Sequence, residues 1–178
     1  MLKIHISLLA LTGLVLLGCN QELSNSSLLP QSQSGGSTGE VQLMITAAAD
    51  PEGGLLITAT ARNTGHQSLR YQATCGRADM EFRFTDADGH ELRVTNPCEP
   101  QPMMGCPTAL GVVLAPGGTA YGTHWWSGQL WEGCTGTPAM PGSYQVTVTF
   151  SYYQGFEIGR EDVVASVTFA WGEPVVRD

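Results

Sequence analysis

The chain has 178 residues and a formal net charge of −8 at neutral pH, from sixteen acidic and eight basic side chains. An acidic surface repels the phosphates of nucleic acids and of anionic lipids, so the composition argues against nucleic-acid binding and against electrostatic docking on a membrane. About 140 residues follow the first forty, which suits one domain with a sizeable hydrophobic core.

Residues 1–18 have the form of an export signal. Lys3 is their only charged side chain, and a short apolar run follows it. This order is typical of a signal peptide, and the run is shorter than a typical membrane span. It ends in Leu16-Leu17-Gly18-Cys19, which resembles a bacterial lipobox, where the cysteine becomes the lipidated first residue. We therefore expect Cys19 to anchor the protein to a membrane of the cell envelope, facing the periplasm or the exterior. The alternative is a transmembrane anchor, or an ordinary signal peptide with an incidental cysteine.

Residues 19–39 are expected to form the lipidated cysteine and a flexible tether. They are rich in Ser, Gln, Asn and Gly and contain few apolar side chains. Such a segment buries too little apolar surface to offset the entropy lost on ordering. The folded domain is therefore expected to cover residues 40–178.

From residue 40 onward, apolar and polar residues alternate with a period of two. This alternation is typical of strands with one buried face, and turns rich in Gly and Pro separate the segments. The predicted strands cover residues 41–47, 55–62, 69–73, 80–85, 92–94, 110–114, 119–126, 144–152 and 163–171. The pattern predicts an all-β protein, an antiparallel sandwich with Greek-key connections and about eight or nine strands.

Four cysteines remain after Cys19, and an even number in an exported chain predicts two disulfides. None of them has the C-x-x-C spacing of a zinc or redox site. If the turn at residues 86–89 pairs Thr85 with His90, the continued register brings Cys98 near Cys75. If residues 114 and 119 pair across the next Pro-Gly turn, Cys106 lies near the loop that holds Cys134. The register therefore predicts the pairs Cys75–Cys98 and Cys106–Cys134.

The order of four short elements resembles the BsuPI-like family of bacterial proteinase inhibitors. The matching elements are TATARNTG at 58–65, MEFRFTD at 80–86 with Gly89, LAPGG at 114–118 followed by Trp125 or Trp126, and PGSYQV at 141–146. The resemblance implies an immunoglobulin-like sandwich that inhibits serine proteinases by binding them. It transfers no reactive-site residue to a position of this chain.

Motifs for catalysis and for metal binding are sparse. The chain has no G-x-S-x-G, H-E-x-x-H or P-loop motif, and spacing gives His124 neither a nucleophile nor an orienting acid. The series Asp86, Asp88, Gly89 and Glu91 matches the start of a calcium loop, but a polar hairpin turn explains it equally. Met103, Met104 and Cys106 near His124 could suggest copper, although methionines in such a loop usually serve packing. We therefore predict a protein that is not an enzyme and needs no metal or cofactor.

Three tryptophans form the most informative cluster. Adjacent strand residues point to opposite faces, so Trp125 and Trp126 cannot both enter one core. The outward one and Trp131, in a loop expected over residues 127–139, either pack beneath a disulfide or form a binding patch for a protein or a glycan.

The sequence thus predicts a lipid-anchored binding module. The expected partner is an exported serine proteinase, met by the loops at residues 96–107 and 127–139. A different class remains open, an envelope structural, assembly or adhesion lipoprotein without a protease target.

Overall fold

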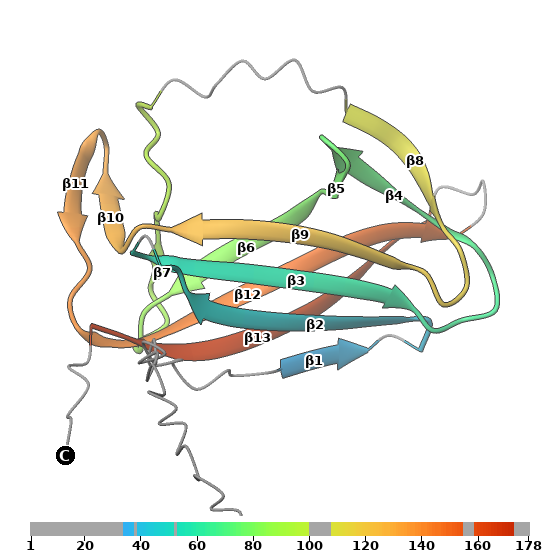
Figure 1. Ribbon diagram of the computed structural model, residues 1–178, viewed down its shortest axis with the longest axis horizontal. Coiled ribbons are helices and arrows are strands. Elements are labelled where there is room, and N and C mark those ends of the chain that lie inside the picture. The colour runs from blue at the N-terminus through green and yellow to red at the C-terminus, as the bar shows by residue number, and fades with distance from the viewer. Residues whose placement is uncertain (1–33, 38, 52, 100–107, 155–158, 173–178) are drawn as a thin grey trace, which may run out of the picture.

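The computed structural model describes residues 34–37, 39–51, 53–99, 108–154 and 159–172. Every regular element in these ranges is a strand, and the strands pair antiparallel in two large sheets and one small hairpin (Figure 1). The predicted all-β antiparallel sandwich is confirmed. Within the same ranges, no helix is long and apolar enough to cross a membrane.

The first sheet follows the order β1-β2-β3-β9. Its strands are β1 (Ser34–Ser37), β2 (Val41–Ala49), β3 (Leu55–Asn63) and β9 (Thr119–Trp126). Figure 1 shows β2, β3 and β9 crossing in front of the second sheet.

The second sheet is organised around one long strand. One edge of this central strand, β12, pairs with β13, and the other edge pairs with β6 and then with β4. The strands of this sheet are β4 (Leu69–Thr74), β5 (Arg77–Ala78), β6 (Met80–Thr85), β7 (Glu91–Leu92), β8 (Thr108–Leu114), β12 (Gly142–Gln154) and β13 (Arg160–Trp171).

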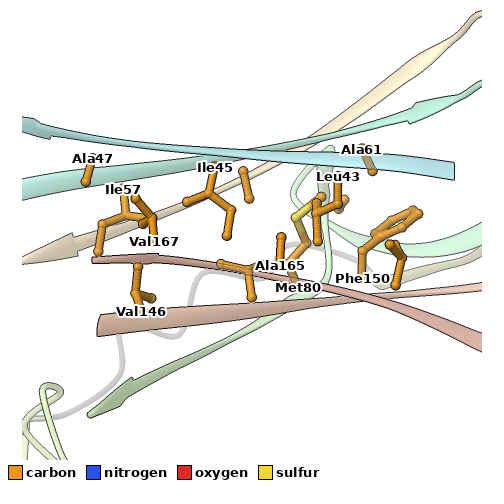
Figure 2. Close-up of a cluster of buried hydrophobic side chains, with 14 of the residues drawn as sticks. Leu43, Ile45, Ala47, Ile57, Ala61, Met80, Val146, Phe150, Ala165 and Val167 are labelled. Carbon is orange, nitrogen blue, oxygen red and sulfur yellow. The ribbon is translucent and has the colours of Figure 1, made fainter. Parts of the chain in front are cut away.

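The core fills the space between the two sheets. Inward residues alternate with outward ones along each strand, as the period-two pattern predicted. Figure 2 shows Ile45 and Ile57 of the first sheet facing Val146 and Val167 of the second. All four side chains are buried, and burial of apolar surface is the main force that holds such sheets together.

The chain crosses between the sheets at two adjacent turns. β3 leads into β4, and β8 leads back into β9, so the turn at residues 115–118 does not close a hairpin. Leu114 pairs instead with Leu69 of β4, and Thr119 pairs with Arg62 of β3. Asn63 lies between the two turns and is fully buried. Its amide group connects them.

The folded unit begins earlier than the sequence predicted. β1 lies within the expected tether and pairs with β2, Ser34 opposite Ile45 and Ser37 opposite Gln42. Gly36 also lies against the backbone of Val164 on β13, at a distance that leaves no room for a Cβ. The Gly/Ser composition that indicated a tether therefore also permits this close approach of three strands, and the domain boundary at residue 40 is wrong.

We expect Gly36→Val to destabilise the protein by about 1–3 kcal/mol, because the new side chain must push β1 away from β13. Gly35→Val is the matched control, since a Cβ at Gly35 meets its nearest neighbour, the Leu43 carbonyl, at an ordinary 3.6 Å. Urea unfolding of both variants measures the difference. Equal midpoints for the two variants would show that β1 contributes nothing to the folded state.

Candidate functional site

Trp126, at the end of β9, is the centre of the aromatic core and is fully buried. Its indole Nε1 donates a hydrogen bond of 2.9 Å to the carbonyl oxygen of Gln129. Four rings surround it with centroid distances of 4.8–5.8 Å: Phe84, Tyr144, Phe169 and Trp171. Trp126 was predicted as a binding residue, and this is wrong, because its ring is packed on all sides and offers no surface to a partner.

The segment after Trp126 is a hairpin and not the loop that the sequence predicted. β10 (Gln129–Glu132) pairs with β11 (Thr135–Pro138) and the hairpin stands at one end of the molecule (Figure 1). Its base is closed by the Ala139 N–H, which donates to the Gly128 carbonyl at 2.8 Å. Gly128 has φ 77° and packs on the Trp171 ring so closely that only glycine fits. The aromatic core therefore sets the position of the hairpin.

Trp125 and Trp131 occupy different surroundings. Trp125 is 51% exposed on the outer side of β9, which confirms that neighbouring tryptophans point to opposite faces. Trp131 is half-buried, and its ring covers Gly136 on the partner strand, where a Cβ would come within 2.9 Å. The Trp131 N–H donates to the Arg93 carbonyl at 2.9 Å. Trp131 thus packs within the hairpin, and the three tryptophans do not form one patch.

The disulfide links Cys98 to Cys134, with 5.4 Å between their Cα atoms. Both predicted pairs, Cys75–Cys98 and Cys106–Cys134, are therefore wrong. The first failed because Thr85 pairs with Glu91, one residue beyond the expected register, and β7 ends at Leu92. The chain then leaves the sheet and runs to the β10–β11 hairpin. The second failed because the turn at residues 115–118 crosses between sheets.

Non-reducing peptide mapping should yield a peptide pair containing Cys98 and Cys134. Cys75 is also disulfide-bonded. Cys106 lies outside the described residues, and the cysteine count leaves it as the expected partner if Cys19 is lipidated. A Cys75–Cys106 peptide is therefore the second expected product. A Cys75–Cys134 peptide would contradict the arrangement of the hairpin.

A cavity of about 430 Å³ opens between β9 and the β6–β7 edge. Seven residues line it: Phe82, Glu91, Leu92, Arg93, Val94, Thr95 and His124. Five of these residues, 91–95, belong to the segment that leads to Cys98. The lining mixes apolar and polar side chains, and Glu91 and Arg93 are exposed.

His124 points inward, on the same face of β9 as Trp126. Its ring stacks on Phe82 at 5.5 Å and tilts against Phe84 at 5.2 Å. In the described part of the chain its buried Nε2 has no hydrogen-bond partner. Burial lowers the pKa of His124, so the imidazole is neutral near pH 7. Glu91 lies 3.7 Å from Arg83 Nε. Among the residues that the structure describes, no acid is paired with the His124 imidazole to orient it as a base.

The free energy of unfolding should fall as the pH drops below about 6.5, because the unfolded histidine takes up a proton first. Since the folded-state pKa of His124 is lowered, this loss continues down to that pKa and then stops. His124→Phe should flatten this pH dependence, while His66→Phe, at an exposed turn, should preserve it. Urea unfolding between pH 7 and 5 measures the effect. A profile unchanged by His124→Phe would show that another group is responsible.

The acidic series after β6 forms a turn. Asp86 Oδ1 accepts the N–H groups of Asp88 at 2.9 Å and His90 at 2.8 Å, and its Oδ2 lies 3.1 Å from His90 Nδ1. The backbone hydrogen bond from His90 is the main cause that lowers the pKa of Asp86. Asp86, Asp88 and His90 are close enough to hold a cation, but both oxygens of Asp86 already serve the turn. The polar hairpin explanation therefore accounts for the motif.

Several predictions fall outside the described residues. These are the signal peptide, the lipidated Cys19, most of the tether, and the loop residues Met103, Met104 and Cys106. Of the predicted loop at residues 96–107, only residues 96–99 are described, and they form a turn in which Asn96 Oδ1 accepts the Cys98 N–H at 2.9 Å.

Sequence reasoning missed two features of the candidate site: the exposed ring of Tyr121 and the cavity lined by residues 91–95. Tyr121 is 53% exposed on the same side of β9 as Trp125, and the spacing of four residues along a strand could have shown this. The same parity places His124 with Trp126 on the inner side. The cavity residues after β7 carried no comparable signal, because β7 ends at Leu92 and the chain beyond it no longer follows the strand register.

A scan against protein-family models matches no family, and no curated protein matches the chain.

Proposed function

We propose that this protein is a lipid-anchored, non-enzymatic binding module of the bacterial cell envelope. It docks on another protein through the β10–β11 hairpin, which the Cys98–Cys134 disulfide holds. An exported serine proteinase is the first candidate partner. The observation behind the proposal is the fixed β10–β11 hairpin. It is held by the Cys98–Cys134 disulfide, by the Trp126–Gln129 hydrogen bond and by the Trp131–Arg93 hydrogen bond. A segment fixed in advance loses little conformational entropy when it binds.

The outward residues of the hairpin suit contact with a protein. Thr135, Thr137 and Pro138 are exposed on β11, and Met140 just beyond it is the most exposed apolar side chain at this end. Inhibition by binding requires a rigid segment presented to the cleft of a proteinase. The resemblance to the BsuPI-like family supports this kind of partner, and the hairpin is the segment that we assign to it.

The anchor is a separate part of the proposal. Fourteen residues, 20–33, lie between Cys19 and the start of β1. They span at most about 50 Å when extended, which limits how far the hairpin can reach from the membrane. A fatty-acid analogue should label the wild-type protein in cells and should not label Cys19→Ser. Labelling that survives the Cys19→Ser change would refute the anchor.

Inhibition assays with the full-length protein in detergent test the docking surface. We expect micromolar inhibition of subtilisin or trypsin, and we expect Thr135→Arg to weaken it at least tenfold, because the bulky cation stands on the exposed hairpin strand. Thr119→Arg, an identical change at an exposed position of β9, should leave inhibition intact.

Two results would contradict this reading. Inhibition that Thr135→Arg does not change would move the contact away from the hairpin. Absence of inhibition, together with capture of an envelope protein that Thr135→Arg abolishes, would support the alternative of a structural or assembly lipoprotein.

A further inference from the structure

The outer face of β2, β3 and β9 differs from the rest of this acidic protein. On β3 and β9 it consists of cross-strand pairs: Leu56 with Trp125, Thr58 with Thr123, Thr60 with Tyr121 and, at its end, Arg62 with Thr119. Arg77 of β5 donates from Nη1 to the Thr123 hydroxyl at 2.8 Å. Two aromatic rings thus flank a row of threonines. Among the outward residues of these three fully described strands none is acidic. We call this surface the threonine face.

The opposite side of the sandwich has a different character. There, Arg83 bonds Glu81 at 2.9 Å, and Arg160 bonds Asp162 at 3.0 Å. The outward residues of β2, β3 and β9 include no acid, and the part of the threonine face between Trp125 and Tyr121 carries no charged side chain of β3 or β9. The contrast indicates a neutral partner with little need for ionic contacts.

Trp125 is also held in place. Its ring lies against Gly54, where φ is 105° and a Cβ would come within 3.1 Å of ring atoms Cε2 and Cζ2. Glycine at this turn lets the indole rest against the backbone while half of its surface remains exposed. An aromatic ring that is immobile before binding is a good anchor, since little side-chain entropy is lost.

The spacing of the two exposed rings suits an extended chain. Tyr121 and Trp125 are four residues apart on one strand, so their Cα atoms are about 13 Å apart. The C–H faces of β-linked sugar rings are apolar and pack on aromatic rings, while their hydroxyl groups exchange hydrogen bonds with threonine hydroxyls. Thr58 and Thr60 supply such hydroxyls between the rings. A neutral glycan chain lying along β9 would meet all of these groups.

We propose that the threonine face binds a neutral, β-linked polysaccharide. This surface shares no residue with the β10–β11 hairpin, so the inference does not depend on the proposed contact with a proteinase. A protein with both surfaces would hold a glycan of the envelope while its hairpin stays free.

The test uses the full-length protein in detergent with chitohexaose and cellohexaose as neutral probes. Tryptophan fluorescence and titration calorimetry measure binding. We expect at least one probe to bind in the millimolar range or tighter, and Trp125→Ala and Tyr121→Ala each to weaken binding about tenfold. Val164→Ala, at an exposed apolar residue on the other side of the sandwich, is the matched control and should bind like wild type.

The outcomes separate the two surfaces. Trp125→Ala should keep any proteinase inhibition, and Thr135→Arg should keep glycan binding. Absence of binding to both probes at millimolar concentration would overturn the proposal, as would binding that Trp125→Ala leaves unchanged. Loss of a protein–protein contact in Trp125→Ala, without any glycan binding in wild type, would instead assign the face to a protein partner.

Discussion

Asn63→Asp is expected to destabilise the protein by about 3–5 kcal/mol at pH 7, although it exchanges one amide group for a carboxylate of the same shape. Asn63 is fully buried. Its Nδ2 donates to the carbonyl oxygens of Gln67 at 2.7 Å and Leu114 at 3.0 Å, and its Oδ1 accepts the Gly65 N–H at 3.0 Å. Aspartate keeps the acceptor but loses both donors, so a buried carboxylate would face two carbonyl oxygens.

The pH dependence of this variant provides an internal check. Burial and the facing carbonyl oxygens should raise the folded-state pKa of the new carboxyl group above its value in the unfolded chain. The deficit in the free energy of unfolding should therefore be largest above the folded-state pKa. It should shrink as the pH falls from that pKa to the unfolded-state pKa of about 3.9, below which the group is protonated in both states. Urea unfolding at several pH values measures it.

Asn96→Asp is the matched control for this change. Asn96 uses its side chain as an acceptor for the Cys98 N–H, and a carboxylate performs that task equally well. We expect its effect to stay within about 0.5 kcal/mol. A similar loss for both variants would mean that the Asn63 amide does not connect the two crossing turns.

The two turns joined by Asn63 also show what local sequence could not predict. The strands on either side of them followed from alternation, because each has one buried and one exposed face. A Pro-Gly turn, however, suits both a hairpin and a crossing between sheets. Which of the two forms depends on whether Leu114 pairs with a residue of β4 or with one of β9. Residues 114–119 do not indicate which strand that is.

Strands without an alternating apolar face were missed for a related reason. β1 and β11 are made of Gly, Ser, Thr and Pro, so no apolar alternation marks them, although each pairs with an adjacent strand, β1 with β2 and β11 with β10. The disulfide pairing failed with them, since Cys98 reaches Cys134 only because the segment after β7 follows the hairpin. The aromatic part of the candidate site was predictable to the extent that it followed strand parity, which correctly separated Trp125 from Trp126.

Trp126→Ala is expected to cost about 3–5 kcal/mol, since it opens a cavity among four packed rings. Trp126→Phe keeps an aromatic ring but loses the 2.9 Å hydrogen bond to the Gln129 carbonyl, so we expect a smaller loss of about 1–3 kcal/mol. That carbonyl belongs to the first residue of β10. The Phe variant should therefore loosen the hairpin more than the sandwich.

Trp125→Ala, one position earlier on the same strand, is the matched control. Its ring is half exposed on the outer face, so its removal should cost less than about 1 kcal/mol. Urea unfolding compares the three variants, and amide hydrogen exchange in Trp126→Phe distinguishes β10–β11 from β12. If exchange rises equally in both, the indole serves only as core. If it rises in the hairpin alone, Trp126 is the residue through which the core positions the proposed docking segment.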